Sequence, residues 1–333
     1  MAEYFLGIDV GSVSTDLVII NGDDKILSKL YLRTRGAPIE VLTDGLMKLQ
    51  KEFGNLEVAG VGTTGSGRQL AGVIVGADII KNEITAHATA AQNIVPDVRT
   101  ILEIGGQDSK IIFLKNGVVT DFAMNTVCAA GTGSFLDRQA ARLNIPIEHF
   151  GEYALRSRNP TRIAGRCAVF AESDMIHKQQ MGHCEEDIIA GLCEALVRNY
   201  LNNLAKCKEI SEPIIFQGGV AANVGIVAAF ERALGKRVII PQNYDVMGAY
   251  GAALLARQNR ERTGKETSFY GFNHAYGTVE TSSYECKGCD NRCEIIEVRD
   301  SGVVTARWGD RCGKWSGQGK AASNAAKEGS SAS

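Results

Sequence analysis

Two short segments decide the fold of this chain: they read GIDVGSVST at residues 7–15 and EIGGQDS at residues 103–109. Each joins two apolar runs through glycine and hydroxyl residues, which is typical of a tight turn between two strands. Each is followed by an Asn-Gly turn, at 21–22 and at 116–117, and by a third strand-like run. Because the whole pattern recurs about 95 residues further along, the sequence predicts an internal duplication.

The two turns also predict a phosphate-binding site, because their backbone N–H groups and hydroxyls can point toward phosphate oxygens. A plain hairpin turn is the alternative for either one taken alone, but a third glycine turn at 217–219 favours a nucleotide. Asp9 and Asp108 lie where a carboxylate can hold Mg²⁺ through water, and they are the predicted catalytic residues. The residues predicted to contact the nucleotide are Gly11, Ser12, Val13, Ser14, Thr15, Gly105, Gly106, Gln107, Gly131, Thr132, Gly133, Gly218, Gly219, Val220, Ala221 and Gln242.

Composition excludes several classes of protein. The 333 residues are enough for two domains, and a net charge of -2 disfavours nucleic-acid binding. No run of 18 apolar residues predicts a membrane span, and the N-terminus does not resemble a signal peptide. Nine cysteines beside five histidines, without a secretory signal, indicate a cytoplasmic protein with thiolate ligands rather than a disulfide framework.

The glycine segments resemble the phosphate-1, phosphate-2 and adenosine motifs of the actin/Hsp70/hexokinase ATPase superfamily. The matching residues are 7–12, 103–108 and 218–221, and residues 245–252 are similar to its second connecting helix. The resemblance implies an α/β fold with two ribonuclease-H-like lobes. A P-loop enzyme is excluded because no GxxxxGK[ST] motif is present, and the acidic residue expected of a Rossmann site is missing as well.

Five regions follow from this interpretation. We expect a first ATPase lobe, a second ATPase lobe, a polar linker, a Cys-rich module and a disordered tail. Their predicted ranges are 1–98, 99–257, 258–283, 284–315 and 316–333.

Two cysteines point to an iron–sulfur centre. Cys128 and Cys167 each lie at a predicted helix N-terminus, where the partial positive charge favours a thiolate. The alternative is that both are buried and inert. Because a [4Fe–4S] cluster needs four thiolates, two chains related by a two-fold axis would be required to complete one.

The segments around both cysteines, CAAGTG from Cys128 and CAVFAES from Cys167, make the resemblance more specific. Over about residues 3–257 the chain resembles the ATP-dependent activators of 2-hydroxyacyl-CoA dehydratases, a family shared with the ATPase subunits of benzoyl-CoA reductase. The resemblance implies a homodimer in which Cys128 and Cys167 of both chains hold one bridging [4Fe–4S] cluster. It also implies that turnover of ATP to ADP drives an electron from a donor such as ferredoxin or flavodoxin onto a partner iron–sulfur protein. A sugar or small-metabolite kinase, or an ATP-binding metal sensor or adaptor, are the alternatives.

Four further cysteines predict a metal site in the C-terminal module. Cys286, Cys289, Cys293 and Cys312 lie within 27 residues and suit Zn²⁺ or a second [4Fe–4S] cluster, with unligated thiols as the alternative. This module departs from the short activators of the family and leaves the acceptor protein open.

The remaining reactive side chains have simpler predicted roles. His87 is expected to be a hydrogen-bonded polar group beside the cleft, with a catalytic base as the alternative. Lys110 is expected to be a surface lysine on a strand, with a contact to phosphate as the alternative. Cys193 and Cys207 are expected to pack in the core around the helix at 185–207.

Overall fold

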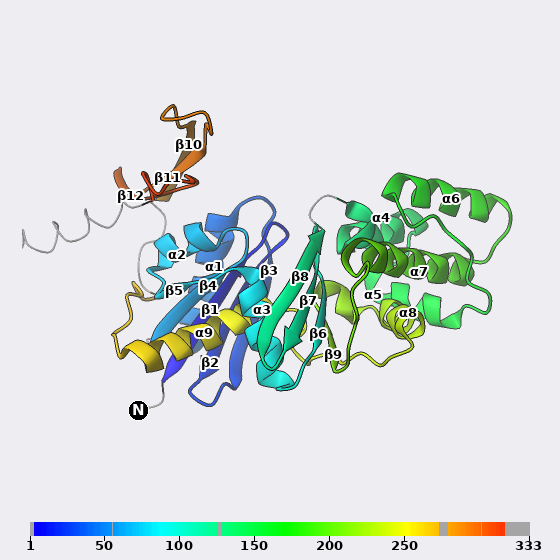
Figure 1. Ribbon diagram of the computed structural model, residues 1–333, viewed down its shortest axis with the longest axis horizontal. Helices are drawn as coiled ribbons and strands as arrows, with labels where there is room; N and C mark the ends of the chain where they lie inside the picture. The colour runs from blue at the N-terminus through cyan, green and yellow to red at the C-terminus, as the bar shows by residue number, and fades with distance from the viewer. Residues whose placement is uncertain (1–2, 55, 126–127, 273–278, 301, 317–333) are drawn as a thin grey trace, which may run out of the picture.

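Two β-sheets, one in each lobe, organise the chain (Figure 1). The structure is a computed structural model that describes residues 3–54, 56–125, 128–272, 279–300 and 302–316. The first sheet has the strand order β3-β2-β1-β4-β5 and the second the order β8-β7-β6-β9. Their bounds are β1 Tyr4–Val10, β2 Ser14–Asn21, β3 Ile26–Arg33, β4 Gly60–Thr64, β5 Ile79–Ile80, β6 Thr100–Ile104, β7 Ser109–Lys115, β8 Val118–Asn125 and β9 Ile214–Gln217.

The predicted duplication is confirmed strand by strand. β1, β2 and β3 form an antiparallel meander, and so do β6, β7 and β8. In each lobe the next strand of the sheet pairs in parallel with the first strand of the meander. Residues 237–240 form no strand: Ile239 makes a single bridge to Ile215, and Pro241 follows, which lacks the N–H that further pairing would need.

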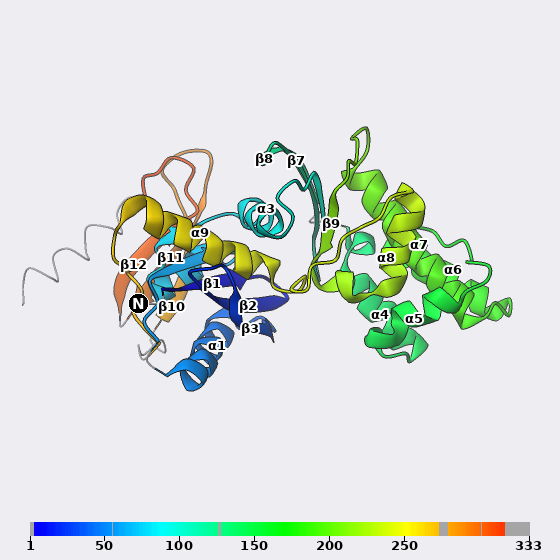
Figure 2. The ribbon, with the colours of Figure 1, turned by 90° about the horizontal axis from the view of Figure 1, so that it is seen from below.

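Helices surround both sheets. In the first lobe these are α1 Pro38–Phe53, α2 Arg68–Val75, α3 Glu83–Ile94 and α9 Met247–Thr263. In the second lobe they are η1 Ala129–Gly131, α4 Gly133–Leu143, α5 Ile147–Arg156, α6 Ala168–Gln180, α7 Glu185–Leu204, η2 Gly219–Ala222 and α8 Val224–Leu234. Helix α3 packs along α9 and reaches β8, so it connects the two lobes (Figure 2).

Helix α9 departs from the expected domain division. It packs on β1 and β4 of the first lobe, although residues up to 257 were expected in the second, and it continues to Thr263 inside the predicted linker. The contact is close because Gly7 of β1 and Gly62 of β4 lack side chains. A Cβ on Gly7 would overlap the backbone of Ala249, and a Cβ on Gly62 would overlap that of Ala252.

The core of the second lobe forms around α7. The apolar face of α7 is buried, and the ring of Tyr200 packs edge-on against Phe230 at 5.3 Å. Cys193 is buried on the same helix, as expected. The expectation for Cys207 is wrong: it lies beyond the end of α7 with a positive φ, and its side chain is exposed.

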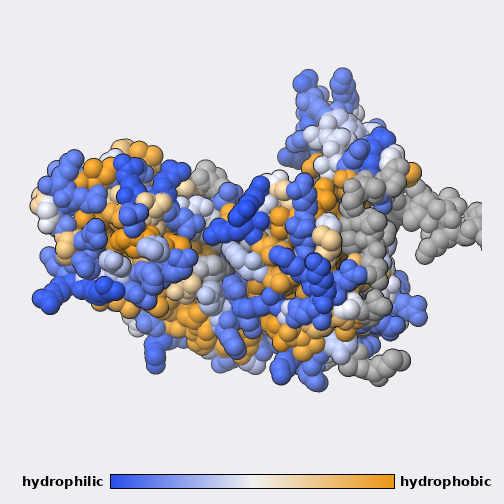
Figure 3. Space-filling view, turned by 180° about the vertical axis from the view of Figure 1, so that it is seen from behind, coloured by the Kyte–Doolittle hydropathy of each residue, from blue (hydrophilic) through white to orange (hydrophobic). Residues whose placement is uncertain are grey.

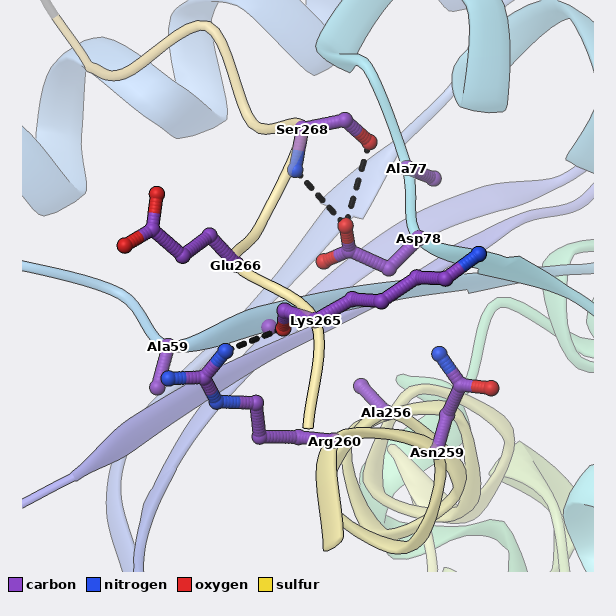
Figure 4. Close-up of a pocket in the computed structure, with 10 residues that line it drawn as sticks. Ala59, Ala77, Asp78, Ala256, Asn259, Arg260, Lys265, Glu266 and Ser268 are labelled. Carbon is purple, nitrogen blue, oxygen red and sulfur yellow. Dashed lines mark hydrogen bonds between the residues drawn. The ribbon is translucent and has the colours of Figure 1, made fainter. Parts of the chain in front are cut away.

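The segment that follows α9, residues 264–272, packs against the first lobe (Figure 4). Asp78 accepts hydrogen bonds from the backbone N–H of Ser268 at 2.7 Å and from the hydroxyl of Thr267 at 2.7 Å. Phe269 and Phe272 pack into the first-lobe core. Three antiparallel strands then form the Cys-rich module: β10 Val279–Glu285, β11 Glu294–Asp300 and β12 Val303–Trp308. It lies beside the first lobe, at the opposite end of the molecule from α6 (Figure 1). The predicted tail lies, beyond Ser316, outside the described residues.

Polar and apolar residues are intermixed on the face shown in Figure 3. Among the residues that the structure describes, no helix combines the length and the apolarity that a membrane crossing requires.

Candidate nucleotide site and cysteine pair

Two adjoining cavities, of about 190 and 330 Å³, lie between the lobes. The smaller is lined by the β1–β2 turn of the first lobe and by the β6–β7 turn of the second. Both duplicated turns therefore face the same space. They also touch, because a Cβ on Gly106 would lie 2.7 Å from a methyl group of Val13. Glycine at position 106 therefore leaves the room that the Val13 side chain occupies.

Most of the predicted nucleotide residues line these cavities. The smaller cavity is lined by Asp9, Gly11, Ser12, Val13, Ser14, Gly105, Gly106, Gln107, Asp108, Gly218 and Gly219. Gly133 and Val220 line the larger one. The structure does not bring the other predicted residues to either cavity: Thr15, Gly131, Thr132, Ala221 and Gln242. Thr15 bonds to Thr34, Thr132 bonds to the carbonyl oxygen of Ala129, and Gln242 is exposed.

Lys110 is not the surface lysine that was expected. Only 3% of its side chain is exposed, and it lines the smaller cavity. Its Nζ lies 2.8 Å from Glu83, 2.9 Å from Asp108 and 3.1 Å from Glu103. Burial by itself would lower the pKa of Lys110, but the three carboxylates together raise it, so the ammonium group stays charged. Lys110 thus connects β6, β7 and the start of α3.

Asp9 is a half-buried acid near the end of β1. Burial, reinforced by the negative charge of Glu83, raises its pKa to about 7. A Cβ on Gly248 would collide with the Asp9 carboxylate, so the glycine at the start of α9 leaves the room that this side chain occupies. An acid poised near neutrality inside a cavity is typical of a catalytic or metal-binding position.

His87 is a hydrogen-bonded polar group beside the cleft, as the sequence suggested. The amide nitrogen of Gln217 donates to its Nδ1 at 2.7 Å, and a neutral ring would then carry its proton on Nε2. Burial, together with the charge of Lys110, lowers the pKa of His87 to about 3. The imidazole is therefore neutral at physiological pH.

This shift makes acid stability a test of the His87 environment. The unfolded chain binds a proton at His87 below about pH 6.5 while the folded chain does not, so stability is lost as the pH falls. Between pH 6.5 and 5 we expect the free energy of unfolding to fall by about 2 kcal/mol more in the wild type than in His87→Gln. Urea unfolding at both pH values measures this difference, and equal pH dependence in the two proteins would contradict a buried neutral imidazole.

Several residues in the cavities were missed by sequence reasoning. Glu83 is the first residue of α3, directly after Asn82, whose side chain caps the helix by accepting from the Thr85 N–H at 2.9 Å. An Asn followed by an acidic residue is a typical start of a helix, so the sequence did indicate a helix beginning at Glu83. The other missed residues include Asp16, Tyr31, Arg33, Asp137, Glu148, Asn223 and Asp245. Asp16 directly follows the predicted turn at 7–15, whereas the others come from distant segments that only the fold brings together.

Cys128 and Cys167 lie at helix N-termini, as predicted, and both are half-buried free thiols. The Sγ of Cys128 lies 3.8 Å from the carbonyl oxygen of Arg166, the residue before Cys167. Asn199 of α7 connects the two loops, since its amide contacts the Sγ of Cys128 and donates to the carbonyl oxygen of Gly165. One chain therefore presents two neighbouring cysteine-bearing segments.

The four cysteines of the C-terminal module are not gathered in the same way. Within the described part of the chain, no three Cys, His, Asp or Glu side chains form a group that could hold a metal ion. Cys286 is buried and accepts from the indole N–H of Trp315 at 3.2 Å, which lowers the pKa of its thiol. Cys289 and Cys312 are exposed.

The sequence matches the BadF/BadG/BcrA/BcrD ATPase family over residues 6–256, which is most of the chain and includes both duplicated turns and both Cys128 and Cys167. The chain belongs to this family. The match ends at Ala256 within α9, so residues 264–272 and the Cys-rich module lie outside the region that defines the BadF/BadG/BcrA/BcrD ATPases.

Individual proteins that are similar to this BadF/BadG/BcrA/BcrD ATPase support the family assignment. The (R)-2-hydroxyglutaryl-CoA dehydratase activating ATPase of Acidaminococcus fermentans is 36% identical over 264 residues, which are 77% of this chain and 98% of the relative. The structure of the activator of the 2-hydroxyisocaproyl-CoA dehydratase from Clostridium difficile with bound ADPNP is 32% identical, with a TM-score of 0.72, covering 78% of this chain and 97% of that one.

A more distant match bears on the fold. A ROK family glucokinase from Streptomyces griseus, in complex with glucose and AMPPNP, is 15% identical with a TM-score of 0.51, covering 77% of this chain and 99% of that one. At this identity it shows only that the fold is shared. The expected actin/Hsp70/hexokinase-like ATPase fold is confirmed, and ATP binding belongs to the family.

Proposed function

We propose that this chain is a homodimeric iron–sulfur ATPase that couples ATP binding and hydrolysis to the transfer of low-potential electrons onto a partner iron–sulfur protein. The partner would be a 2-hydroxyacyl-CoA dehydratase or a related double-cluster reductase. The names of the similar proteins, both dehydratase activators, support this role. The single observation that carries it is the short segment from Cys128 to Ser134, which contacts the β6–β7 turn of the nucleotide cavity at one end and carries a cysteine at the other.

The two turns would bind the nucleotide phosphates. Residues of the β1–β2 and β6–β7 turns line the smaller cavity, and a glycine-rich turn of this kind can bind anions through its backbone N–H groups. The larger cavity would take the nucleoside, because it combines apolar Leu136 and Ile147 with polar Asp137 and Glu148. ATP would thus lie between the lobes and contact both.

Asp9 and Asp108 would hold Mg²⁺ with the phosphates. Both carboxylates face the smaller cavity, and oxygen ligands are the ones that Mg²⁺ prefers. When bound, the cation offsets the negative charge that develops on the phosphates. The Nζ of Lys110 lies 2.9 Å from the carboxylate of Asp108 and 2.8 Å from that of Glu83. These two ion pairs would keep Asp108 and Glu83 oriented into the cavity.

The thiols of Cys128 and Cys167 would supply two of the four ligands of a [4Fe–4S] cluster, and a second chain the other two. Such a cluster, when bound, accepts and donates single electrons. Two neighbouring half-buried free thiols at helix N-termini fit this donor set. The exposed side chains of Val169 and Phe170 beside Cys167 would be covered in the dimer.

Coupling between nucleotide and cysteines follows from the start of α4. The N–H groups of Gly133 and Ser134 donate to the carbonyl oxygens of Gly105 and Gly106, each at 2.9 Å. ATP that moves the β6–β7 turn would therefore move α4 and, one turn upstream, Cys128. For ATP to shift most of the molecules from one arrangement of α4 to the other, it must bind one arrangement more tightly by a few kcal/mol. A donor such as ferredoxin or flavodoxin would then reload the dimer.

We also propose that the C-terminal cysteines bind Zn²⁺ or a second iron–sulfur cluster, with Cys286, Cys289, Cys293 and Cys312 as ligands. The lowered pKa of Cys286 favours the thiolate that a metal needs.

Metal analysis of anaerobically purified full-length protein tests the proposed cluster and the proposed C-terminal metal together. We expect about four irons per dimer plus the metal of the C-terminal module. No iron would leave a kinase-like ATPase.

Asp9→Asn tests the catalytic role. We expect ATP turnover to fall by about 100-fold or more, with nucleotide binding and iron content retained, because the carboxylate acts on bound phosphates and not on the thiols. Steady-state hydrolysis, equilibrium binding and iron analysis measure the three quantities. Asp23→Asn, in the exposed β2–β3 turn, is the matched control. Turnover within twofold of the wild type would remove Asp9 from the catalytic site.

A further inference from the structure

Asp16 is a buried carboxylate in the cleft for which neither the predicted motifs nor the proposed function has a role. It lies on β2 directly opposite Asp9 of β1 and directly opposite Tyr31 of β3. Side chains of directly opposed residues in antiparallel strands project from the same face, with Cβ atoms about 5 Å apart. Asp16 and Asp9 therefore stand side by side, and both line the smaller cavity.

One oxygen of Asp16 has no hydrogen-bond partner among the residues that the structure describes. Its side chain is only 6% exposed, and Oδ2 accepts from the hydroxyl of Ser14 at 3.2 Å. Oδ1 is buried and, among the described residues, receives no hydrogen bond. A buried carboxylate oxygen without a donor is costly and calls for a ligand that the protein itself does not supply.

The nearby charges do not compensate Asp16. Burial raises the pKa of Asp16, and the nearby acids Asp9 and Asp245 raise it further. Lys29 lies 2.8 Å from Asp245 and so is paired already. Lys110 is surrounded by its own three carboxylates. Within the described ranges, no cationic side chain forms an ion pair with Asp16. The position thus combines two adjacent carboxyl groups, burial and an oxygen without a hydrogen-bond donor, and a bound cation would stabilise the ionised carboxylates there.

We propose that Asp16, together with Asp9, binds a divalent cation of the oxygen-preferring class, Mg²⁺ or Mn²⁺, in the nucleotide-free cleft. This cation site is separate from the Mg²⁺ that Asp9 and Asp108 would hold with the phosphates. Its use in ATP chemistry rests on the proposed function, but its existence does not. A resident cation would offset the paired carboxylates and make the cavity receptive to a polyphosphate.

Mn²⁺ titration of the nucleotide-free, full-length protein, followed by electron paramagnetic resonance of the free ion, tests the site. We expect one Mn²⁺ per chain in the wild type and at least tenfold weaker binding in Asp16→Asn. Asp121→Asn, an exposed carboxylate on β8, is the matched control and should bind as the wild type does. Equal Mn²⁺ binding by Asp16→Asn and the wild type would overturn the proposal.

A second measurement guards against misfolding. In EDTA, Asp16→Asn should melt at the same temperature as the wild type or higher, because a buried carboxyl group beside two other acids is replaced by a neutral amide. Mg²⁺ should raise the melting temperature of the wild type and not of the variant, and an equal rise in both proteins would overturn the site. Binding of an ATP analogue to the wild type is measured separately, so failure of the nucleotide site is distinguishable from failure of the cation site.

Discussion

Cys128→Ala is expected to remove essentially all iron of the bridging cluster and to abolish electron transfer to a partner protein. Each chain would supply two thiolates to a cluster that needs four, so the substitution leaves two ligands for the whole dimer. Cys167→Ala should have the same effect, because the two segments lie together: the Sγ of Cys128 is 3.8 Å from the carbonyl oxygen of Arg166. Iron and sulfide analysis after anaerobic purification measures the loss.

The chain offers a matched control in Cys184, a free thiol that is exposed ahead of α7. Cys184→Ala should keep the wild-type iron content. ATP binding should survive in all three variants, since Gly105 and Gly106 are held by the start of α4 and not by a thiol. Wild-type iron in Cys128→Ala, after allowance for any metal of the C-terminal module, would contradict the proposed cluster ligands.

Lys110→Met is expected to lower the free energy of unfolding by about 3–5 kcal/mol, the range for removing one partner of a buried ion pair. The substitution preserves most of the side-chain volume but leaves Glu83, Glu103 and Asp108 without their shared cation. The loss follows from uncompensated charge at a site where the lysine is almost fully buried. Chemical unfolding at pH 7 measures it.

The double variant Lys110→Met/Glu103→Gln separates charge from packing. Because Glu103 is the most buried of the three carboxylates, removing its charge should recover part of the lost stability. Both variants should also lose ATP turnover, since Glu83 and Asp108 would no longer be held toward the cavity. A loss below about 1 kcal/mol in Lys110→Met would mean that the carboxylates are neutral in the folded protein.

Much of the fold could be predicted because its signals are local. Both meanders show as apolar runs separated by glycine turns and Asn-Gly turns, and the turn chemistry specifies a hairpin wherever it occurs. The register of the β1–β2 hairpin also places Asp16 opposite Asp9. The helix N-terminal positions of Cys128 and Cys167 follow from local sequence in the same way.

Only the tertiary structure decided what depends on segments far apart in the chain. Lys110 looks like any strand lysine until α3 and β6 bring Glu83 and Glu103 to it. Helix α9 belongs with the first lobe because glycines on β1 and β4 admit its backbone, a fit that no local pattern encodes. Burial and charge compensation are set by the neighbours that folding supplies, whereas turns and periodicity are set by the residues themselves.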